Sequence, residues 1–281
     1  MGVTVVTDSG SDLSRAEATS LGIEIVPVSI LLGEDRFRDG IDIDRATFFA
    51  RVAAGEIPKT ESPSQAQFQE VFARASGAGN DVVAIVLSSK ISQSYANALA
   101  AAKEFGAHVH VVDSLGSAGA ETLLALYALE LAKKGTPLAE IAKRVDPKAV
   151  KSAAYFAMHD VATLGRSGRL PAAVVALGSL TNVRLVLKFN EEGVIVPAGQ
   201  SFSFDKTCEL MVEAVVRAIE HAPNVRVSFG HTQAEEAATA LKKMFQAKLG
   251  HPPAQEYTRE ASLTISTHQG VGALGIYAIV A

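Results

Sequence analysis

The stretch "IVLSSKISQSYANA", residues 85–98, starts with apolar, β-branched residues and ends in an alanine-rich pattern that favours a helix. Its middle carries four serines: Ser88, Ser89, Ser92 and Ser94. A strand that passes through a polar loop into a helix is the repeating unit of parallel α/β proteins. The stretch therefore predicts an α/β fold. It also raises the question whether these serines are a catalytic nucleophile with its neighbours, an anion site or a helix cap.

The same alternation extends through the first half of the chain. Short β-branched strands are predicted at 3–7, 23–30, 82–87 and 108–112, with helices at 13–21, 45–54, 65–75 and 94–105. A long amphipathic helix is predicted over 117–135, where Lys-Lys-Gly ends it, and a short helix follows over 137–145. We therefore expect an N-terminal, Rossmann-like α/β domain with a parallel sheet.

The second half has a different pattern. A strand is predicted at 152–158, and a hairpin over 183–204 turns at 190–193. Helices are predicted at 205–221 and 234–249, and strands at 225–229, 254–258 and 275–280. A chain of 281 residues is long enough for two domains, and "DPK" at 146–148 separates the two patterns. We expect domains at 1–148 and 149–281, the second an α+β domain with a mixed or antiparallel sheet.

The composition restricts the class of protein. With 48% hydrophobic residues, 20% charged residues and a net charge of −4, the chain has no basic excess of the kind that binds nucleic acid. The single cysteine, Cys208, excludes an internal disulfide and is expected to fill core space. The first residues show no signal peptide, and the apolar runs are too short to cross a bilayer. We expect a cytoplasmic protein without stable membrane insertion.

Four loops that precede predicted helices are rich in hydroxyl groups. They are "TDSGSDL" (7–13), "TESPSQ" (60–65), "SSKISQSY" (88–95) and "DSLGSAG" (113–119). Each one alone is explained as a helix cap, because Ser, Thr and Asp are the preferred capping residues. In a parallel sheet, however, such loops gather at one edge, where helix N-termini attract anions. Together they predict a site for a carboxylate or a phosphate.

A serine hydrolase is the enzymatic alternative. The nucleophile elbow G-x-S-x-G needs small residues beside the serine, whereas Ser92 is flanked by Ile91 and Gln93. A triad would also need a histidine base, for which His231 and His268 are the candidates. An esterase or acyltransferase that uses Ser92 with one of these histidines therefore stays open as the alternative function.

Two other patterns point away from cofactors. "GVGALG" (270–275) matches the dinucleotide fingerprint, but a predicted strand follows it in place of the required helix. His108 and His110 alternate in a strand and are more typical of a half-exposed strand face than of metal ligands. We expect neither a nicotinamide cofactor nor a metal.

The segment "LGRSGRL" (164–170) presents two arginines on a turn with two glycines. An arginine held on such a turn can clamp an anion with several donors. Arg169 is the stronger candidate for this role and Arg166 the weaker. The apolar helix "PAAVVALGSL" is predicted directly after it, with Pro171 in its first turn.

The motifs, in their order, resemble the DegV family of bacterial fatty-acid-binding proteins. The resemblance is carried by "VTDSGSDL", "TESPS", "LSSKISQSYANA", "VVDSLGSAG", "LGRSGRL", "LTNVRLVLKFNEEG", "FGHTQAEEA" and "STHQGVGALGI". These segments extend over nearly the whole chain, and eight of them in order are far more specific than any one alone.

The resemblance implies that a long-chain fatty acid of palmitate to stearate size lies between the two domains. Its carboxylate would be bound by Thr60, Ser92, His268 and Arg169. Supporting positions would be Ser94, Ser64, Gly168, His231, Thr267 and Gly270. Some members carry the lipid for a fatty-acid kinase and present it to a separate ATP-binding subunit. The resemblance thus implies a carrier without catalytic residues, with that kinase subunit as a partner.

The sequence departs from the family pattern at a few positions. Glu61 replaces a usual serine, Gln93 a usual glycine and Gly10 a frequent threonine. Where many members have an arginine, this chain has Ser201, Phe202 and Ser203. The last departure bears on the kinase partner more than on the binding of the lipid.

Overall fold

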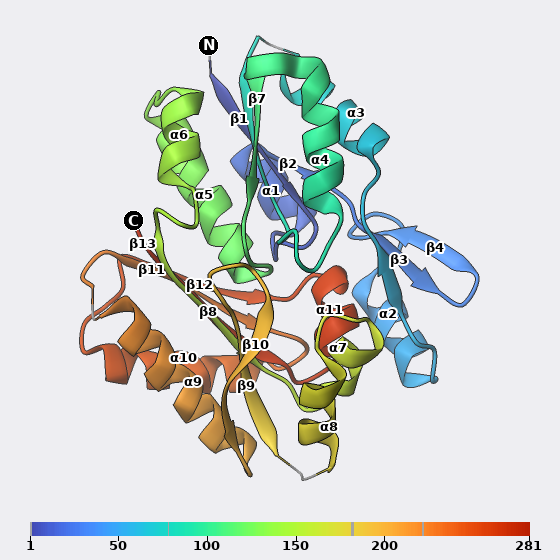
Figure 1. Cartoon of the computed structure of the whole chain (residues 1–281), viewed down its shortest axis with the longest axis vertical. Helices are drawn as coiled ribbons and strands as arrows, with labels where there is room; N and C mark the ends of the chain where they lie inside the picture. Colours follow the sequence, from blue (N-terminus) through green and yellow to red (C-terminus); the bar gives the residue numbers. More distant parts are fainter. Residues whose placement is uncertain (1, 78, 181–182, 221) are drawn as a thin grey trace.

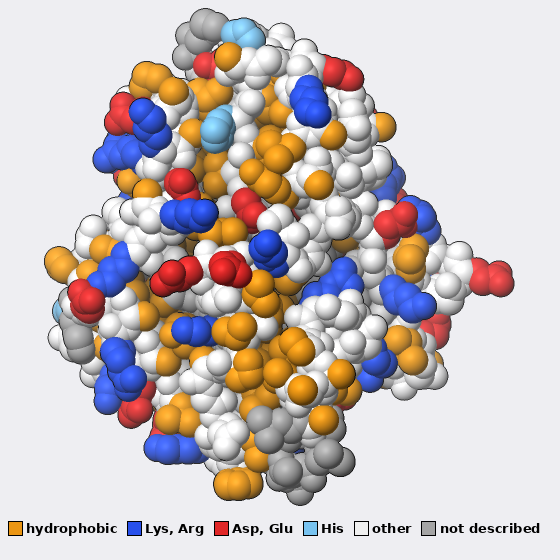
Figure 2. Space-filling view, in the orientation of Figure 1, with side chains coloured by type: hydrophobic (Ala, Val, Ile, Leu, Met, Phe, Trp, Pro, Cys, Tyr) orange, Lys and Arg blue, Asp and Glu red, His pale blue; other side chains and the backbone are white. Residues whose placement is uncertain are grey.

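The computed structural model describes residues 2–77, 79–180, 183–220 and 222–281 (Figure 1). These residues form a parallel sheet in the N-terminal half, a mixed sheet in the C-terminal half and a small antiparallel sheet beside the first. Acidic and basic side chains are interspersed on the face shown in Figure 2. In the described part of the chain, no helix combines the length and the apolar character needed to cross a membrane.

The N-terminal sheet has the strand order β2-β1-β6-β7, with every neighbouring pair parallel. Its strands are β1 (Val3–Asp8), β2 (Ile23–Val26), β6 (Asp81–Val86) and β7 (Val109–Asp113). One face is covered by α1 (Arg15–Leu21), α5 (Gly119–Lys133) and α6 (Leu138–Arg144), the other by α3 (Gln65–Ala75) and α4 (Ser94–Ala102). Burial on both faces explains why these strands are almost continuously apolar in sequence. The predicted parallel α/β half is confirmed.

The small sheet has the order β4-β3-β5 and is antiparallel. It consists of β3 (Ser29–Leu32), β4 (Asp35–Arg38) and β5 (Lys59–Glu61), and α2 (Arg45–Ala53) packs on it through Phe48. The prediction of one strand over 23–30 was wrong. Pro27 lies between β2 and β3, and because proline has no N–H to donate, the chain leaves the parallel sheet there.

The C-terminal sheet has the order β10-β9-β8-β13-β11-β12. Its strands are β8 (Lys151–Ala157), β9 (Arg184–Phe189), β10 (Ile195–Ser201), β11 (Val225–His231), β12 (Gln255–Glu260) and β13 (Leu274–Val280). Only the β11–β12 pair is parallel among these described strands, so the predicted mixed sheet is confirmed. Helices α9 (Phe204–Ile219) and α10 (Glu235–Leu249) pack on one face. Buried side chains of α5 pack in one cluster with Tyr277 and Ile279 of β13. This contact joins the two halves.

Three short helices complete the described chain: α7 (Ala162–Arg166), α8 (Ala172–Leu180) and α11 (Leu263–Gln269). The sequence predicted α8, but it predicted neither α7 nor α11. His268 lies in the last turn of α11, which Ser262 caps by accepting from Ile265 N. The β-branched residues of α11 favour a strand by local preference. For this reason the sequence did not predict the helix. Helix α11 packs against β3 and β5 of the small sheet.

Another predicted helix differs at its C-terminal end. The α-helix expected over 94–105 ends at Ala102. The chain continues as the 3₁₀ segment η1 (Lys103–His108), in which Gly106 has a φ of 57°. The expected end of α9 at His221 lies outside the described residues. The predicted domain boundary at 148 lies between α6 and β8. It stays a prediction, because α11 of the C-terminal half returns to the small sheet of the N-terminal half.

Candidate functional site

A cavity lies where loops of the N-terminal half meet the C-terminal sheet. The space between its lining atoms, counted together with the open solvent at its mouth, is about 560 Å³. Its apolar wall consists of Val28, Leu87, Ile91, Phe156, Leu164, Phe189, Ile195 and Ile265. Its polar lining consists of Thr60, Ser62, Ser92, Ser117, Arg169, Thr264, His268 and Gln269. All four predicted carboxylate-binding residues are therefore on the wall of one cavity.

Thr60 and His268 are 208 positions apart in sequence, but their side chains meet in the structure. Thr60 is held in β5 opposite Ile30 of β3, and α11 places His268 beside it, with Thr60 Oγ1 2.8 Å from His268 Nε2. Burial, followed by the positive charge of Arg169, lowers the pKa of His268 to about 4. The imidazole is therefore neutral at neutral pH. Its Nδ1 is buried and has no hydrogen-bond partner within the described chain, so it can bind a ligand.

Ser92 lies between β6 and α4 and belongs to a chain of hydrogen-bonded serines. Its Oγ lies 2.9 Å from Ser62 Oγ, donates to Ser94 Oγ at 3.0 Å and accepts from Ser94 N at 3.1 Å. No histidine of the described chain hydrogen-bonds to Ser92. His268 is paired with Thr60, and His231 Nδ1 accepts from Ala234 N at the end of β11. The geometry of a Ser–His nucleophile is not present at this serine.

A fluorophosphonate probe is accordingly expected to leave Ser92 unlabelled. Such probes react with serines whose hydroxyl is activated by a neighbouring base, and the partners of Ser92 are other hydroxyls. Gel fluorescence or mass spectrometry of the treated protein would measure the labelling, with an active serine hydrolase in the same tube as control. Labelling that disappears in the Ser92→Ala variant would contradict this expectation and favour the hydrolase.

Arg169 reaches the cavity from the turn after α7. Its Nε donates to Ile91 O at 3.1 Å, Nη1 donates to Ser167 O, and Gly168 has the positive φ of 73° that the turn requires. Burial lowers the pKa of Arg169, but an arginine remains charged at neutral pH. It therefore supplies a fixed positive charge at the wall of the cavity. Arg166 is not among the lining residues; it donates to Thr163 Oγ1.

The predicted supporting residues have mostly structural positions. Ser64 caps α3 in a capping box with Gln67, and Thr267 Oγ1 donates to Leu263 O within α11. Gly270 ends α11 with a φ of 72°. None of these residues, nor Gly168 or His231, is among those that line the cavity. Ser94 is also absent from the lining, and it contacts the cavity through Ser92.

The serines of the opening stretch thus have different surroundings. Ser88 Oγ donates to Gly193 O at 2.8 Å and fixes the β9–β10 hairpin, whose Phe189 and Ile195 line the cavity. Ser89 is exposed, and Gln93, not a serine, occupies the N-cap position of α4. Ser92 alone of the four lines the cavity.

Several lining residues were not singled out from the sequence. Ser62 had a usable signal, because it lies in the hydroxyl-rich loop at 60–65 and accepts from Gln93 N. Ser117 is in the similar loop at 113–119. Thr264 had none, since α11 was itself unpredicted, and Gln269 lies in the quoted segment 266–276 but was given no role. Phe156 and Phe189 come from strands whose inner and outer faces cannot be assigned without the neighbouring elements.

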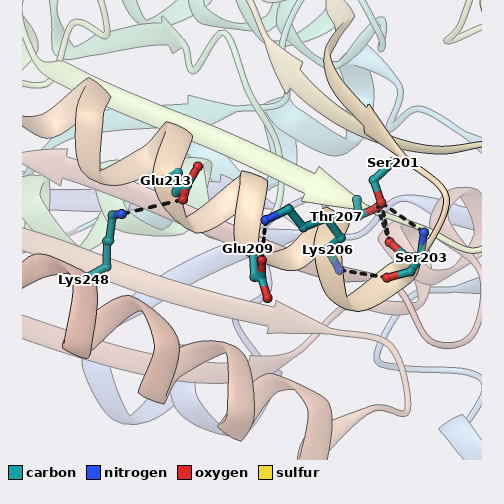
Figure 3. A network of polar contacts seen from close by, with 7 residues as sticks. All are labelled: Ser201, Ser203, Lys206, Thr207, Glu209, Glu213 and Lys248. Atoms are coloured by element: carbon teal, nitrogen blue, oxygen red, sulfur yellow. Dashed lines mark hydrogen bonds and ion pairs between the residues drawn. The ribbon is translucent and has the colours of Figure 1, made fainter.

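The residues at the departures from the family pattern make local contacts. Glu61 forms an ion pair with Arg36. Figure 3 shows the network that contains Ser201 and Ser203 at the start of α9. Ser203 Oγ accepts from Lys206 N, and Ser201 Oγ donates to Ser203 O. Ser203 therefore caps α9 and Ser201 holds the Ser203 backbone, while Phe202 between them is 83% exposed.

A cavity between two α/β halves, with an apolar wall and convergent polar groups, is the kind of site in which proteins bind small molecules. A family model described as an uncharacterised protein of the DegV family matches residues 2–281, and the chain belongs to this family. It is 30% identical over 277 residues to a DegV domain-containing protein of Halalkalibacterium halodurans, with 98% of this chain and 97% of that protein covered. It is also 30% identical over 279 residues to the protein DegV of Bacillus subtilis, with 98% of each covered.

Solved structures agree with this assignment. A DegV family protein of Thermus thermophilus, described by its fatty-acid binding, has a TM-score of 0.92 at 29% identity, with all of both chains covered. The structure of DegV from Bacillus subtilis, described as a fatty-acid-binding protein, has a TM-score of 0.87 at 29% identity, again with full coverage. The predicted family and fold are confirmed.

Proposed function

We propose that this protein binds a long-chain fatty acid in the cavity, with the carboxylate near Thr60, Ser92, His268 and Arg169. The observation that carries the proposal is the convergence of these four polar side chains on one cavity whose remaining lining is largely apolar, with the buried Nδ1 of His268 left without a partner among the described residues. The related DegV structures that are described as fatty-acid-binding proteins support it. A fatty acid matches both parts of the lining, because it has one anionic end and a long apolar tail.

The two ends of the ligand contribute differently to affinity. Burying about 14 methylenes gains on the order of 10 kcal/mol at about 0.8 kcal/mol each. A hydrogen bond to the carboxylate adds about 1 to 3 kcal/mol net. The apolar wall therefore provides most of the affinity, and the polar residues fix the position of the carboxylate.

The protein would act as a carrier and not as an enzyme. Ser92 has hydroxyl partners and no base, so hydrolysis of an ester is not supported by its geometry. A carboxylate held by Thr60, Ser92 and the neutral His268 keeps its negative charge and remains a nucleophile. Such a carrier could present the carboxylate to the ATP-binding subunit of a fatty-acid kinase, which would form an acyl phosphate.

Lipid analysis of the purified protein tests this function. Organic extraction and mass spectrometry are expected to find a long-chain fatty acid, and Ser92→Ala is expected to retain several-fold less, because one hydrogen bond of about 1 kcal/mol or more is lost. Ser89→Ala is the matched control: it removes an exposed hydroxyl from the same loop and should retain the wild-type amount. Wild-type protein that contains and binds no fatty acid would overturn the proposal.

A further inference from the structure

The loop after β1 leaves a space beside Gly10, and the side chain of Leu87 fills that space. A Cβ at Gly10 would lie 2.2 Å from Leu87 Cγ, 2.4 Å from its Cδ2 and 2.5 Å from its Cδ1. Carbon atoms that are not bonded to each other stay about 3.5 to 4.0 Å apart. The side chain of Leu87 can therefore keep this position only because residue 10 has no Cβ.

Leu87 also borders the cavity. It directly follows β6, is 5% exposed and is one of the residues that line the cavity. Among the described residues, it belongs to none of the buried apolar clusters that form the cores of the three sheets. Its side chain thus has the backbone of Gly10 on one side and the cavity on another. A change at Gly10 can therefore reach the ligand site through this one side chain.

The same carboxyl group holds the backbones of both residues. Gly10 N donates to Asp8 Oδ1 at 2.7 Å, and Leu87 N donates to Asp8 Oδ2 at 3.2 Å. Gly10 O also accepts from Ala118 N at 2.7 Å. Asp8 is the last residue of β1 and has no exposed surface, so it is fixed by the parallel sheet. An added Cβ at Gly10 is therefore accommodated more readily by the Leu87 side chain than by a shift of either backbone.

The positions of the outer carbons of Leu87 decide which movement would relieve the contact. Rotation about the Cβ–Cγ bond exchanges the two methyl groups but leaves Cγ in place, 2.2 Å from the added Cβ. The side chain therefore has to change its χ1 angle, which swings the whole isopropyl group to another staggered position. The cavity is the open space that Leu87 borders. We expect the three carbons of the isopropyl group to enter it.

We infer that Gly10 is a specificity-determining residue, which sets how long an acyl chain the cavity accepts by letting Leu87 lie against its backbone and out of the cavity. This inference rests on the proposed function. A side chain at position 10 would turn the isopropyl group of Leu87 into the space of the acyl tail. Because protein interiors are close-packed, these three carbons exclude about three methylenes of the ligand. The protein would then prefer a correspondingly shorter fatty acid.

The effect of Gly10→Ala on affinity should depend on the length of the ligand. A fatty acid that needs the lost space gives up the burial of about three methylenes, which lowers its affinity about 50-fold. A shorter acid that does not need this space keeps its apolar contacts, so its affinity should stay within about three-fold of the wild-type value. A substitution that only loosened the fold would weaken the binding of both acids alike.

Competition binding tests the inference. Saturated fatty acids from caprate to stearate displace a fluorescent fatty acid from the wild type and from Gly10→Ala, and the tightest-binding acid should be shorter for the variant. Gly199→Ala is the matched control, because its Cβ would meet Val186 at an ordinary 3.7 Å and it is not a lining residue. It should keep the wild-type profile. Affinities of Gly10→Ala that are unchanged, or lowered by one factor for every acid, would overturn the inference while leaving fatty-acid binding intact.

A second substitution tests whether Leu87 transmits the effect. Leu87→Ala removes the isopropyl group, so adding Gly10→Ala to it should change the affinity for stearate by less than about two-fold. A decrease as large as in the presence of Leu87 would overturn the inference. Leu87→Ala alone opens the cavity towards Gly10 and should shift the preference to a longer acid; an unchanged profile of this variant would also overturn it, even if Gly10→Ala did not fold. If the wild type bound no fatty acid at all, the proposed function itself would fail.

Discussion

Replacement of Gly119 by alanine is expected to lower the free energy of unfolding by about 3 kcal/mol, through overpacking of the junction between the two halves. Gly119 is the first residue of α5. A Cβ there would lie 2.9 Å from Cγ of Tyr277, nearer still to its Cδ2, and 3.0 Å from Cβ of Ser228. Because helix α5 contacts both the parallel sheet and β13, a shift of α5 would disturb packing in both halves.

The ring of Tyr277 has no space into which it could move. It is 1% exposed, and a Cβ at Gly230 would already lie 3.2 Å from its Cε2. A Cβ at Gly275 would lie 2.5 Å from the Tyr277 hydroxyl oxygen. Three glycines, at 119, 230 and 275, thus surround this one ring. The added methyl group at Gly119 must therefore displace backbone and not merely a flexible side chain.

Urea unfolding followed by circular dichroism measures the effect. Gly199→Ala is the control, since its Cβ would meet Val186 at an ordinary distance of 3.7 Å. That substitution should change the free energy of unfolding by less than about 1 kcal/mol. Equal unfolding midpoints for the two variants would show that the contact of α5 with Tyr277 can relax without cost.

The elements that could be predicted are those whose sequence pattern does not depend on distant parts of the chain. The strands of the parallel sheet could be predicted because both of their faces are buried, which leaves a continuous apolar run in the sequence. The hairpin of β9 and β10 was predicted from its turn at 190–193. Helix α11 was missed because Thr264, Ile265 and Thr267 favour a strand by local preference, and its packing against the small sheet overrides that preference.

The candidate site was only partly predictable for a related reason. Thr60, Ser92 and Arg169 belong to segments whose composition is unusual enough to be noticed, and His268 was found through the family resemblance. Phe156 and Phe189 resemble any other core residues, since nothing local shows that one side of their strands faces a cavity. The pairing of Thr60 with His268 depends on the tertiary fold. The hydroxyl-rich loop at 88–95 indicated an anion site, and the structure shows Ser92 at a cavity wall.

Filling the cavity is expected to reduce fatty-acid affinity by more than 100-fold. Ile195 of β10 lines the apolar wall and is 4% exposed, so Ile195→Trp places an indole in the space proposed for the tail. If the indole excludes about four methylenes, the loss is about 3 kcal/mol, which corresponds to a factor of 100 or more. The larger side chain is expected to cost about 1 to 3 kcal/mol of stability through overpacking.

Binding of a fluorescent fatty acid and the lipid content after extraction would measure this effect, with circular dichroism to verify folding. Leu164→Trp on α7 approaches the cavity from another element and should have the same result. Ile57→Trp is the matched control, because Ile57 is 61% exposed and is not a lining residue. Folded Ile195→Trp and Leu164→Trp variants that bind as tightly as Ile57→Trp would place the acyl tail outside this cavity. Since the tail supplies most of the affinity, the carboxylate-binding role of Ser92 would then have to be reassigned with it.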